Sequence, residues 1–152
     1  MRDTKPTDGT PTILVLLAED QVSVRRLVRK ILERAGFTVL VAEDGESAWD
    51  AAGRQPGRLD LLVTDVVMPR MYGTELAERI TRLRPGLPVL FMSGYTDDER
   101  LRRGKLDPCQ AFLEKPFTPQ QLLDTVRTLL ECTRDRRGEA GRPDGDLTGA
   151  RS

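Results

Sequence analysis

Five short apolar runs, separated by stretches of helical periodicity, constrain the fold of this chain more than any other feature. The runs begin roughly every 22 to 28 residues and read ILVLL from residue 13, FTVLVA from 37, LDLLVT from 59, LPVLFM from 87 and QAFLE from 110. Each run is continuous rather than alternating, which is typical of strands that are covered on both faces in a parallel sheet. All five runs are far shorter than the roughly 20 residues that a membrane-spanning helix needs.

The stretches between the runs predict helices. Apolar residues at helical spacing form stripes over 24–32, 48–52, 76–83 and 122–130. A weaker, polar stretch follows residues 96–98. Thr74 is expected to cap the third helix, and Thr118 with Gln121 forms a capping box before the last one, with Pro119 at its first position. Five strand–helix repeats predict an α/β fold, a doubly wound, flavodoxin-like parallel sheet of five strands in the order 2-1-3-4-5 with five helices.

The same pattern sets the domain boundaries. Residues 12–132 carry all five repeats and are expected to form one folded domain. Residues 1–11 mix Thr, Pro, Gly and charges and are predicted to be a flexible leader. Residues 133–152 contain one leucine and four glycines. They are predicted to be a disordered polar tail, because such a segment cannot bury enough apolar surface to order itself.

The composition excludes several classes of function. The 24 basic and 24 acidic residues balance, so no cationic field draws the chain to nucleic acid or to an anionic membrane. The chain has no histidine, which removes serine–histidine triads, histidine metal cages and phosphohistidine carriers. Cys109 and Cys132 are too few and too isolated for a disulfide framework, and we expect two reduced thiols in a cytoplasmic protein.

Charged and polar residues follow four of the predicted strands. Glu19 and Asp20 come after the first strand, Asp65 after the third, Ser93 after the fourth and Lys115 after the fifth. In a doubly wound sheet the carboxyl ends of the strands share one edge, and ligands bind where the first and third strands diverge. The sequence therefore predicts that three carboxylates, one hydroxyl and one ammonium converge there.

Each of these groups suits one task in phosphoryl chemistry. Crowded carboxylates repel one another unless a hard cation lies among them, and Mg²⁺ prefers oxygen ligands. A carboxylate can also act as the nucleophile that takes a phosphoryl group as an acyl phosphate. The cation, the hydroxyl and the ammonium of Lys115 would then each stabilise an oxygen of the transferred group.

Four segments, in this order, resemble the receiver domain of bacterial two-component response regulators: AED (18–20), LLVTDVVMPRMYG (61–73), FMSGYTDD (91–98) and FLEKPF (112–117). The resemblance extends from about residue 12 to about residue 132 and is close to the receivers of hybrid sensor histidine kinases. It implies a cytoplasmic phosphoprotein in a bacterial phosphorelay. Such a domain catalyses only its own phosphoryl transfer and autodephosphorylation, so it is not expected to be an enzyme in the usual sense.

The resemblance also assigns roles to individual residues. Asp65 would be the phosphoacceptor, Lys115 would pair with the phosphoryl group, and Ser93 would be the switch hydroxyl. The implied Mg²⁺ ligands are Asp20, Asp65, the backbone carbonyl of Val67, and Glu19 acting through water. Phe112 takes the position of the switch aromatic residue, and the Lys115–Pro116 peptide bond is expected to be cis.

The chain departs from the usual family pattern in two places. The acidic pair is Glu19-Asp20 where Asp-Asp is common, a variant that keeps the metal-binding oxygens. Arg70-Met71-Tyr72-Gly73 replaces a more usual Gly-Met-Asp/Ser-Gly. Arg70 and Tyr72 border the predicted site, and we expect them to affect partner contacts rather than chemistry.

The implied partner is a histidine kinase or a phosphotransfer protein, whose phosphohistidine would donate to Asp65, and the downstream target is unknown. A homodimer could form through the face of the fourth helix, the fifth strand and the fifth helix. Two rival functions fit less well. An aspartate-nucleophile phosphatase needs a second aspartate at the position of Val67, and a flavin-binding carrier needs a phosphate loop where Glu19 and Asp20 would repel the phosphate. A stand-alone relay and a piece of a hybrid kinase both remain open.

Overall fold

The computed structural model describes residues 12–94 and 109–141, with side chains described as far as Cys132. The described residues form five strands and four helices, which alternate except that β5 follows β4 across the gap from 95 to 108. The elements are β1 (Leu14–Ala18), α1 (Val22–Arg34), β2 (Thr38–Ala42), α2 (Gly45–Arg54), β3 (Leu61–Asp65), α3 (Gly73–Leu83), β4 (Val89–Ser93), β5 (Gln110–Glu114) and α5 (Pro119–Gly141). The fourth predicted helix falls between 95 and 108, and it lies outside the described residues, as does the predicted leader.

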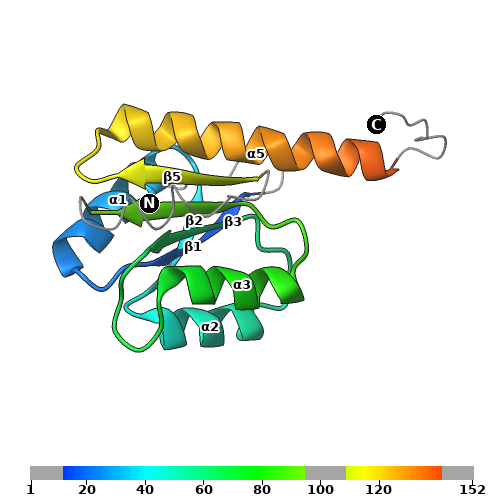
Figure 1. The fold of residues 1–152 in the computed structure, drawn as a ribbon. Helices are drawn as coiled ribbons and strands as arrows, with labels where there is room; N and C mark the ends of the chain where they lie inside the picture. Colours follow the sequence, from blue (N-terminus) through cyan, green and yellow to red (C-terminus); the bar gives the residue numbers. More distant parts are fainter. Residues whose placement is uncertain (1–11, 95–108, 142–152) are drawn as a thin grey trace.

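The strands form one parallel sheet in the order β2-β1-β3-β4-β5 (Figure 1). This order confirms the predicted doubly wound arrangement. The strand order reverses between β1 and β3, so the ends of these two strands open onto the same crevice. In Figure 1 the strands run toward the left-hand side of the view, where their carboxyl ends lie.

Helices cover both faces of the sheet, which explains why the apolar runs are continuous. Helices α1 and α5 lie on one face, and α2 and α3 lie on the other (Figure 1). Successive residues of β1 point into different core clusters: Val15 and Leu17 pack with α1 and α5, whereas Leu16 and Ala18 pack with α2 and α3. A strand that is buried on both faces needs an apolar residue at every position.

The last helix confirms its predicted start but extends further than expected. The Thr118 hydroxyl accepts from the Gln121 N–H at 3.0 Å, and the Gln121 amide oxygen accepts from the Thr118 N–H at 2.8 Å. The helix then continues to Gly141. The prediction of a disordered tail from residue 133 is therefore wrong for residues 133–141. A helix that has already begun gains one hydrogen bond for each residue that it adds, so it can continue into a polar segment. Residues 142–152 lie outside the described part.

The predicted cap of α3 is also wrong. The helix begins at Gly73, so Tyr72 is its N-cap, and Thr74 lies inside the first turn. Gly73 donates its N–H to the Val66 carbonyl at 2.7 Å. The loop that precedes the helix, rather than a side-chain cap, therefore sets where α3 begins.

The two cysteines form a disulfide, so the expectation of two isolated thiols is wrong. Cys109 lies directly before β5, Cys132 lies on α5, and their Cα atoms are 5.9 Å apart. The five residues of β5 advance about 17 Å, and the helix from Pro119 to Cys132 returns about 20 Å. Because these lengths match, α5 brings Cys132 back level with the start of β5.

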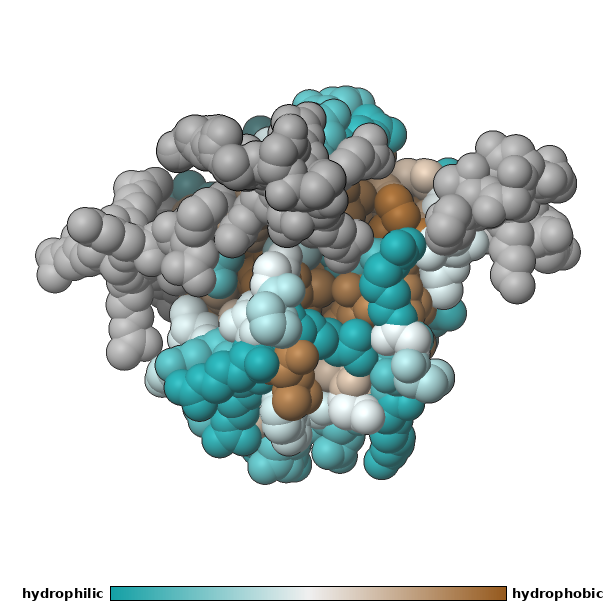
Figure 2. Space-filling model, turned by 90° about the vertical axis from the view of Figure 1, so that its right-hand side faces the viewer, coloured by the Kyte–Doolittle hydropathy of each residue, from teal (hydrophilic) through white to brown (hydrophobic). Residues whose placement is uncertain are grey.

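The start of the sheet is the end remote from the predicted site. Figure 2 views this end and shows hydrophilic residues over its lower half, with apolar side chains between them near the middle. A buried carboxylate, Asp60, belongs to this end: it accepts the Leu14 N–H at 2.9 Å and pairs with Arg58 at 2.6 Å. Among the described helices, none combines the length and the apolar character that crossing a membrane requires.

Candidate functional site

The carboxyl ends of four strands bring the predicted site residues together. Asp65 is the last residue of β3, Ser93 is the last of β4, and Lys115 directly follows β5. Backbone hydrogen bonds hold these ends in register: Val66 N–H donates to the Met92 carbonyl at 2.9 Å, and Lys115 N–H donates to the Ser93 carbonyl at 2.8 Å. The parallel ladder therefore determines which side chains meet.

A lysine bridges two buried carboxylates at the centre of the site. The Lys115 Nζ atom lies 3.0 Å from Asp65 Oδ2 and 3.2 Å from Glu19 Oε1. The Glu19 side chain is fully buried, and its second oxygen accepts the Gln21 N–H at 3.0 Å. The Lys115–Pro116 peptide bond is cis, as the family resemblance implied. Lys115, at the end of β5, therefore contacts residues at the ends of both β1 and β3.

A third carboxylate, that of Asp20, lies beside the two that Lys115 bridges. One oxygen each from Glu19, Asp20 and Asp65 lies within 4.8 Å of the others, so this group could hold a metal ion. Asp20 is exposed, whereas the other two are buried. Carboxylate oxygens at this spacing, with one member open to water, suit a hard cation that keeps part of its water shell.

Burial dominates the protonation of the cluster. Burial, with a smaller contribution from the Asp65 charge, raises the pKa of Glu19 to about 7, against the lowering effect of the Gln21 N–H. Burial also raises the pKa of Asp65 by more than the Lys115 ammonium lowers it. For Lys115, burial lowers the pKa, but attraction to Asp65 and Glu19 outweighs burial and the pKa is raised. Without a cation, the acidic groups of the cluster outnumber its one basic group, and Glu19 becomes protonated as the pH falls through about 7.

The other predicted residues lie around this centre. Ser93 is fully buried, and its hydroxyl donates to the Gly94 carbonyl at 3.0 Å. Phe112 is half-buried on β5 and packs against the core cluster under α2 and α3. The Val67 side chain is 45% exposed. The switch roles of Ser93 and Phe112, and the ligand role of the Val67 carbonyl, stay predictions.

The backbone of the acceptor is held by two residues that the sequence did not single out. The Thr64 hydroxyl donates to the Asp65 carbonyl at 2.9 Å. A Cβ on Gly73 would overlap that same carbonyl oxygen, so only glycine fits there. Gly73, which ends the segment 61–73, could have indicated this contact from the sequence, since close approach of two backbones is a common reason for glycine.

Residues 66–72, here named the acceptor loop, also contact the start of α2. Arg70 donates from Nη1 to Asp44 Oδ2 at 2.5 Å. The other oxygen of Asp44 accepts the Ser47 N–H at 2.7 Å and so caps α2. The sequence marked Arg70 as a departure from the family pattern, but its partner could not be read from spacing.

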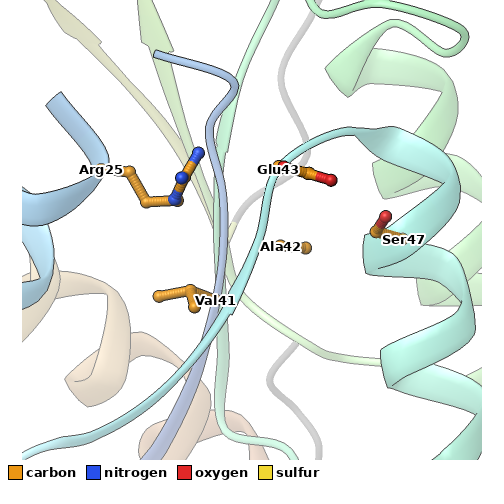
Figure 3. A pocket seen from close by; sticks show the side chains of 5 residues that line it. All are labelled: Arg25, Val41, Ala42, Glu43 and Ser47. Carbon is orange, nitrogen blue, oxygen red and sulfur yellow. The ribbon is translucent and has the colours of Figure 1, made fainter. Parts of the chain in front are cut away.

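An open cavity of about 280 Å³ lies beside the start of α2 (Figure 3). Its lining comes from α1, the end of β2 and α2: Arg25, Val41, Ala42, Glu43 and Ser47. Figure 3 shows Arg25 on one side and Glu43 with Ser47 on the other. Arg25 also donates to the Glu19 carbonyl at 2.9 Å. The cavity therefore adjoins the site but does not contain the bridging lysine.

Known proteins share both the sequence pattern and the fold. A family model described as the response regulator receiver domain matches residues 15–127. The sensor kinase CckA of Brucella abortus is 37% identical over 127 residues, which cover 84% of this chain and 13% of the kinase. The response regulator receiver protein CpdR of the same species is 36% identical over 122 residues, covering 76% of this chain and 95% of CpdR.

A solved structure agrees with these matches. The receiver domain from the hybrid histidine kinase CckA superposes with a TM-score of 0.65 at 30% identity, covering 77% of this chain and 98% of that domain. This chain thus spans a small part of the kinase but nearly all of an isolated receiver. The family match covers most of the chain, including the strand ends that carry the acidic cluster and Lys115. The chain therefore belongs to the response regulator receiver domain family.

Proposed function

We propose that this chain is a phosphoacceptor switch, in which Asp65 takes a phosphoryl group from a partner's phosphohistidine in the presence of Mg²⁺. The observation that carries the proposal is the Lys115 ammonium, 3.0 Å from the Asp65 carboxylate inside a cluster of three acidic residues. The chain itself has no histidine, so the donor is a separate molecule or domain, a histidine kinase or a phosphotransfer protein. In this scheme the chain catalyses only its own phosphorylation and hydrolysis.

The reaction transfers one phosphoryl group from the donor's histidine to Asp65. A carboxylate oxygen of Asp65 forms a bond to phosphorus while the N–P bond of the donor's phosphohistidine breaks. The electron pair of that bond stays on the imidazole nitrogen, which then takes up a proton. Lys115 pairs with an oxygen of the transferred group and so offsets its added negative charge. Attack of water on the phosphorus later releases phosphate and restores the carboxylate.

A divalent cation fits the donor set that surrounds the acceptor. Asp20, Asp65, the Val67 carbonyl and Glu19 acting through water would hold Mg²⁺. When bound there, Mg²⁺ supplies positive charge to the phosphoryl oxygens. Asp20 is the exposed member of the acidic group, which suits a residue that meets an incoming hydrated cation.

The response to phosphorylation is proposed to spread along β4 and β5. Ser93 would turn its hydroxyl from the Gly94 carbonyl toward the phosphoryl group, and Phe112 would repack. Such a change biases the face formed by the fourth helix, β5 and α5 between two states, which a downstream protein or a second copy of the chain can read. The fourth helix lies outside the described residues.

Labelling with acetyl phosphate tests the proposal. The protein is expected to gain the mass of one phosphoryl group in the presence of Mg²⁺, and to gain none when EDTA removes the metal. Intact-protein mass spectrometry measures both results. Equal labelling with and without the metal would contradict a Mg²⁺-dependent acceptor.

The affinity for Mg²⁺ is expected to rise with pH. Since burial raises the pKa of Glu19 to about 7, a proton must leave before this carboxylate can help hold a cation. The affinity should increase about tenfold from pH 6 to pH 8, as one proton is displaced. Calorimetric titrations in buffers of different ionisation enthalpy measure both the affinity and the proton release.

A Glu19→Gln variant is the control for this pH dependence. It keeps an oxygen that can accept from Gln21 and removes the titrating group, so its affinity should be lower and nearly independent of pH in this range. The same raised pKa has the opposite effect on the stability of the folded, metal-free protein, which falls as the pH rises. A pKa raised from 4.5 to about 7 stabilises the folded state below pH 4.5, and this contribution is lost as the pH rises through 7. An unchanged pH dependence in the variant would contradict the assignment to Glu19.

A further inference from the structure

An arginine in the acceptor loop adopts a conformation that favours glycine. Arg70 has φ 72°, and it is the only non-glycine residue with positive φ in the described parts of the chain. Side chains with a Cβ rarely adopt this left-handed conformation. Arginine at this position therefore calls for a compensating contact of its side chain.

The contact is the ion pair with Asp44 at the start of α2. Arg70 Nη1 lies 2.5 Å from Asp44 Oδ2, and the Asp44 side chain is 8% exposed. Because the other Asp44 oxygen accepts the Ser47 N–H, both oxygens of this buried carboxylate are used. One caps α2, and the other attaches the acceptor loop to it. The Ser47 N–H, followed by Arg70, lowers the pKa of Asp44, so the carboxylate is charged at neutral pH.

Two further contacts make the acceptor loop a closed unit. At its base, Gly73 N–H donates to the Val66 carbonyl at 2.7 Å, directly beside the backbone of Asp65. At its tip, Met71 packs so tightly on Gly45 that a Cβ there would lie 2.5 Å from the Met71 Cβ atom. The acceptor loop is thus held at its base by Gly73 and near its tip by Met71.

We propose that Arg70 is a positioning residue, whose ion pair with Asp44 holds the acceptor loop so that the Val67 carbonyl is presented to the cation beside Asp65. This inference rests on the proposed Mg²⁺-dependent function. The Arg70 side chain is 60% exposed, so the pair adds little to global stability. Its effect is local: it keeps the acceptor loop, which carries the Val67 carbonyl, in one conformation.

Two substitutions separate this role from a purely electrostatic one. Arg70→Gly removes the guanidinium and suits the positive φ, and Asp44→Asn keeps an oxygen for the Ser47 N–H but removes the charge. Each is expected to weaken Mg²⁺ binding about tenfold, as loss of a support for a metal ligand does. Electrostatics alone predicts the reverse for Arg70→Gly, because removal of a nearby positive charge strengthens cation binding.

Amide hydrogen exchange of the metal-free protein gives a second readout. Exchange of the Met71 and Gly73 N–H groups, which donate to Pro69 and Val66, should become about tenfold faster in both variants. Arg79→Ala is the matched control, because it removes an exposed arginine ion pair with Glu75 on α3. That variant should leave both readouts unchanged.

The combined results decide the inference. The double variant should be no worse than either single variant, because both substitutions remove the same contact. Unchanged exchange in Arg70→Gly, or Mg²⁺ binding that becomes tighter in it, would overturn the positioning role. If the unmodified protein binds no Mg²⁺, the proposed function fails, and the exchange rates of the metal-free variants still test whether the pair orders the loop.

Discussion

Asp65→Asn protein is expected to take no phosphoryl group from acetyl phosphate under conditions that label the unmodified chain. A carboxamide oxygen is a poor nucleophile and cannot form a stable acyl phosphate, so labelling should fall to the background of the assay. The substitution changes the shape of the side chain little. Lys115 keeps its second partner, Glu19, at 3.2 Å, so the lysine is not left unpaired. Radiolabel incorporation or intact mass measures the loss.

A second buried aspartate provides the matched control. Asp60 is as buried as Asp65, each with 6% of the residue exposed, but it lies at the end where the strands begin. Its carboxylate accepts the Leu14 N–H and pairs with Arg58. An Asp60→Asn variant should therefore label normally, even if it is less stable. Normal labelling of Asp65→Asn, together with loss in Asp60→Asn, would contradict the assignment of the acceptor.

Reduction of the disulfide is expected to lower the free energy of unfolding by about 3 kcal/mol, because the bond closes a loop between residues 23 apart in sequence and so limits the unfolded chain. Urea denaturation with and without a dithiol reductant measures the change. Mg²⁺-dependent labelling should persist in the reduced protein, since Cys109 precedes β5 and Lys115 follows it, about 20 Å further along the strand. In a reducing compartment such a pair is held as thiols, so both forms are relevant.

The Cys132→Ser variant controls for side effects of the reductant. Cys132 is half-buried on α5, whereas Cys109 is 3% exposed, so serine at position 132 disturbs the core less. This variant should resemble the reduced protein and should not respond to reductant. If the unmodified protein has the same stability in both conditions and reacts with thiol reagents from the start, the disulfide assignment is wrong.

The sheet and the central site were predictable because they depend on repeated local patterns. A strand buried on both faces must be apolar at each position, as ILVLL shows, and parallel strands with intervening helices admit few orders. Once the order is given, residues at or just after the carboxyl ends of β1, β3 and β5 share one edge whatever their distance in sequence. Glu19, Asp65 and Lys115 therefore meet, as the structure confirms.

The features that sequence reasoning missed depend on lengths and on single side-chain contacts. Cys109 and Cys132 are distant in sequence, and they meet because α5 runs back along β5 over a matching length. Residues 133–141 have the composition of a tail but continue a helix. The partner of Arg70 comes from the cap of another helix. No periodic pattern in the sequence indicates that contact.

The most direct test of the central claim is to locate the phosphoryl group on the chain. Borohydride reduces an acyl phosphate and converts the modified aspartate to homoserine. The tryptic peptide 59–70 contains both Asp60 and Asp65, and fragmentation distinguishes them. After treatment with acetyl phosphate and Mg²⁺, homoserine is predicted at position 65, with none when EDTA is present. Homoserine at position 60, reduction of Asp20 or Glu19 in a different peptide, or no reduced residue at all, would contradict the claim that Asp65 is the acceptor.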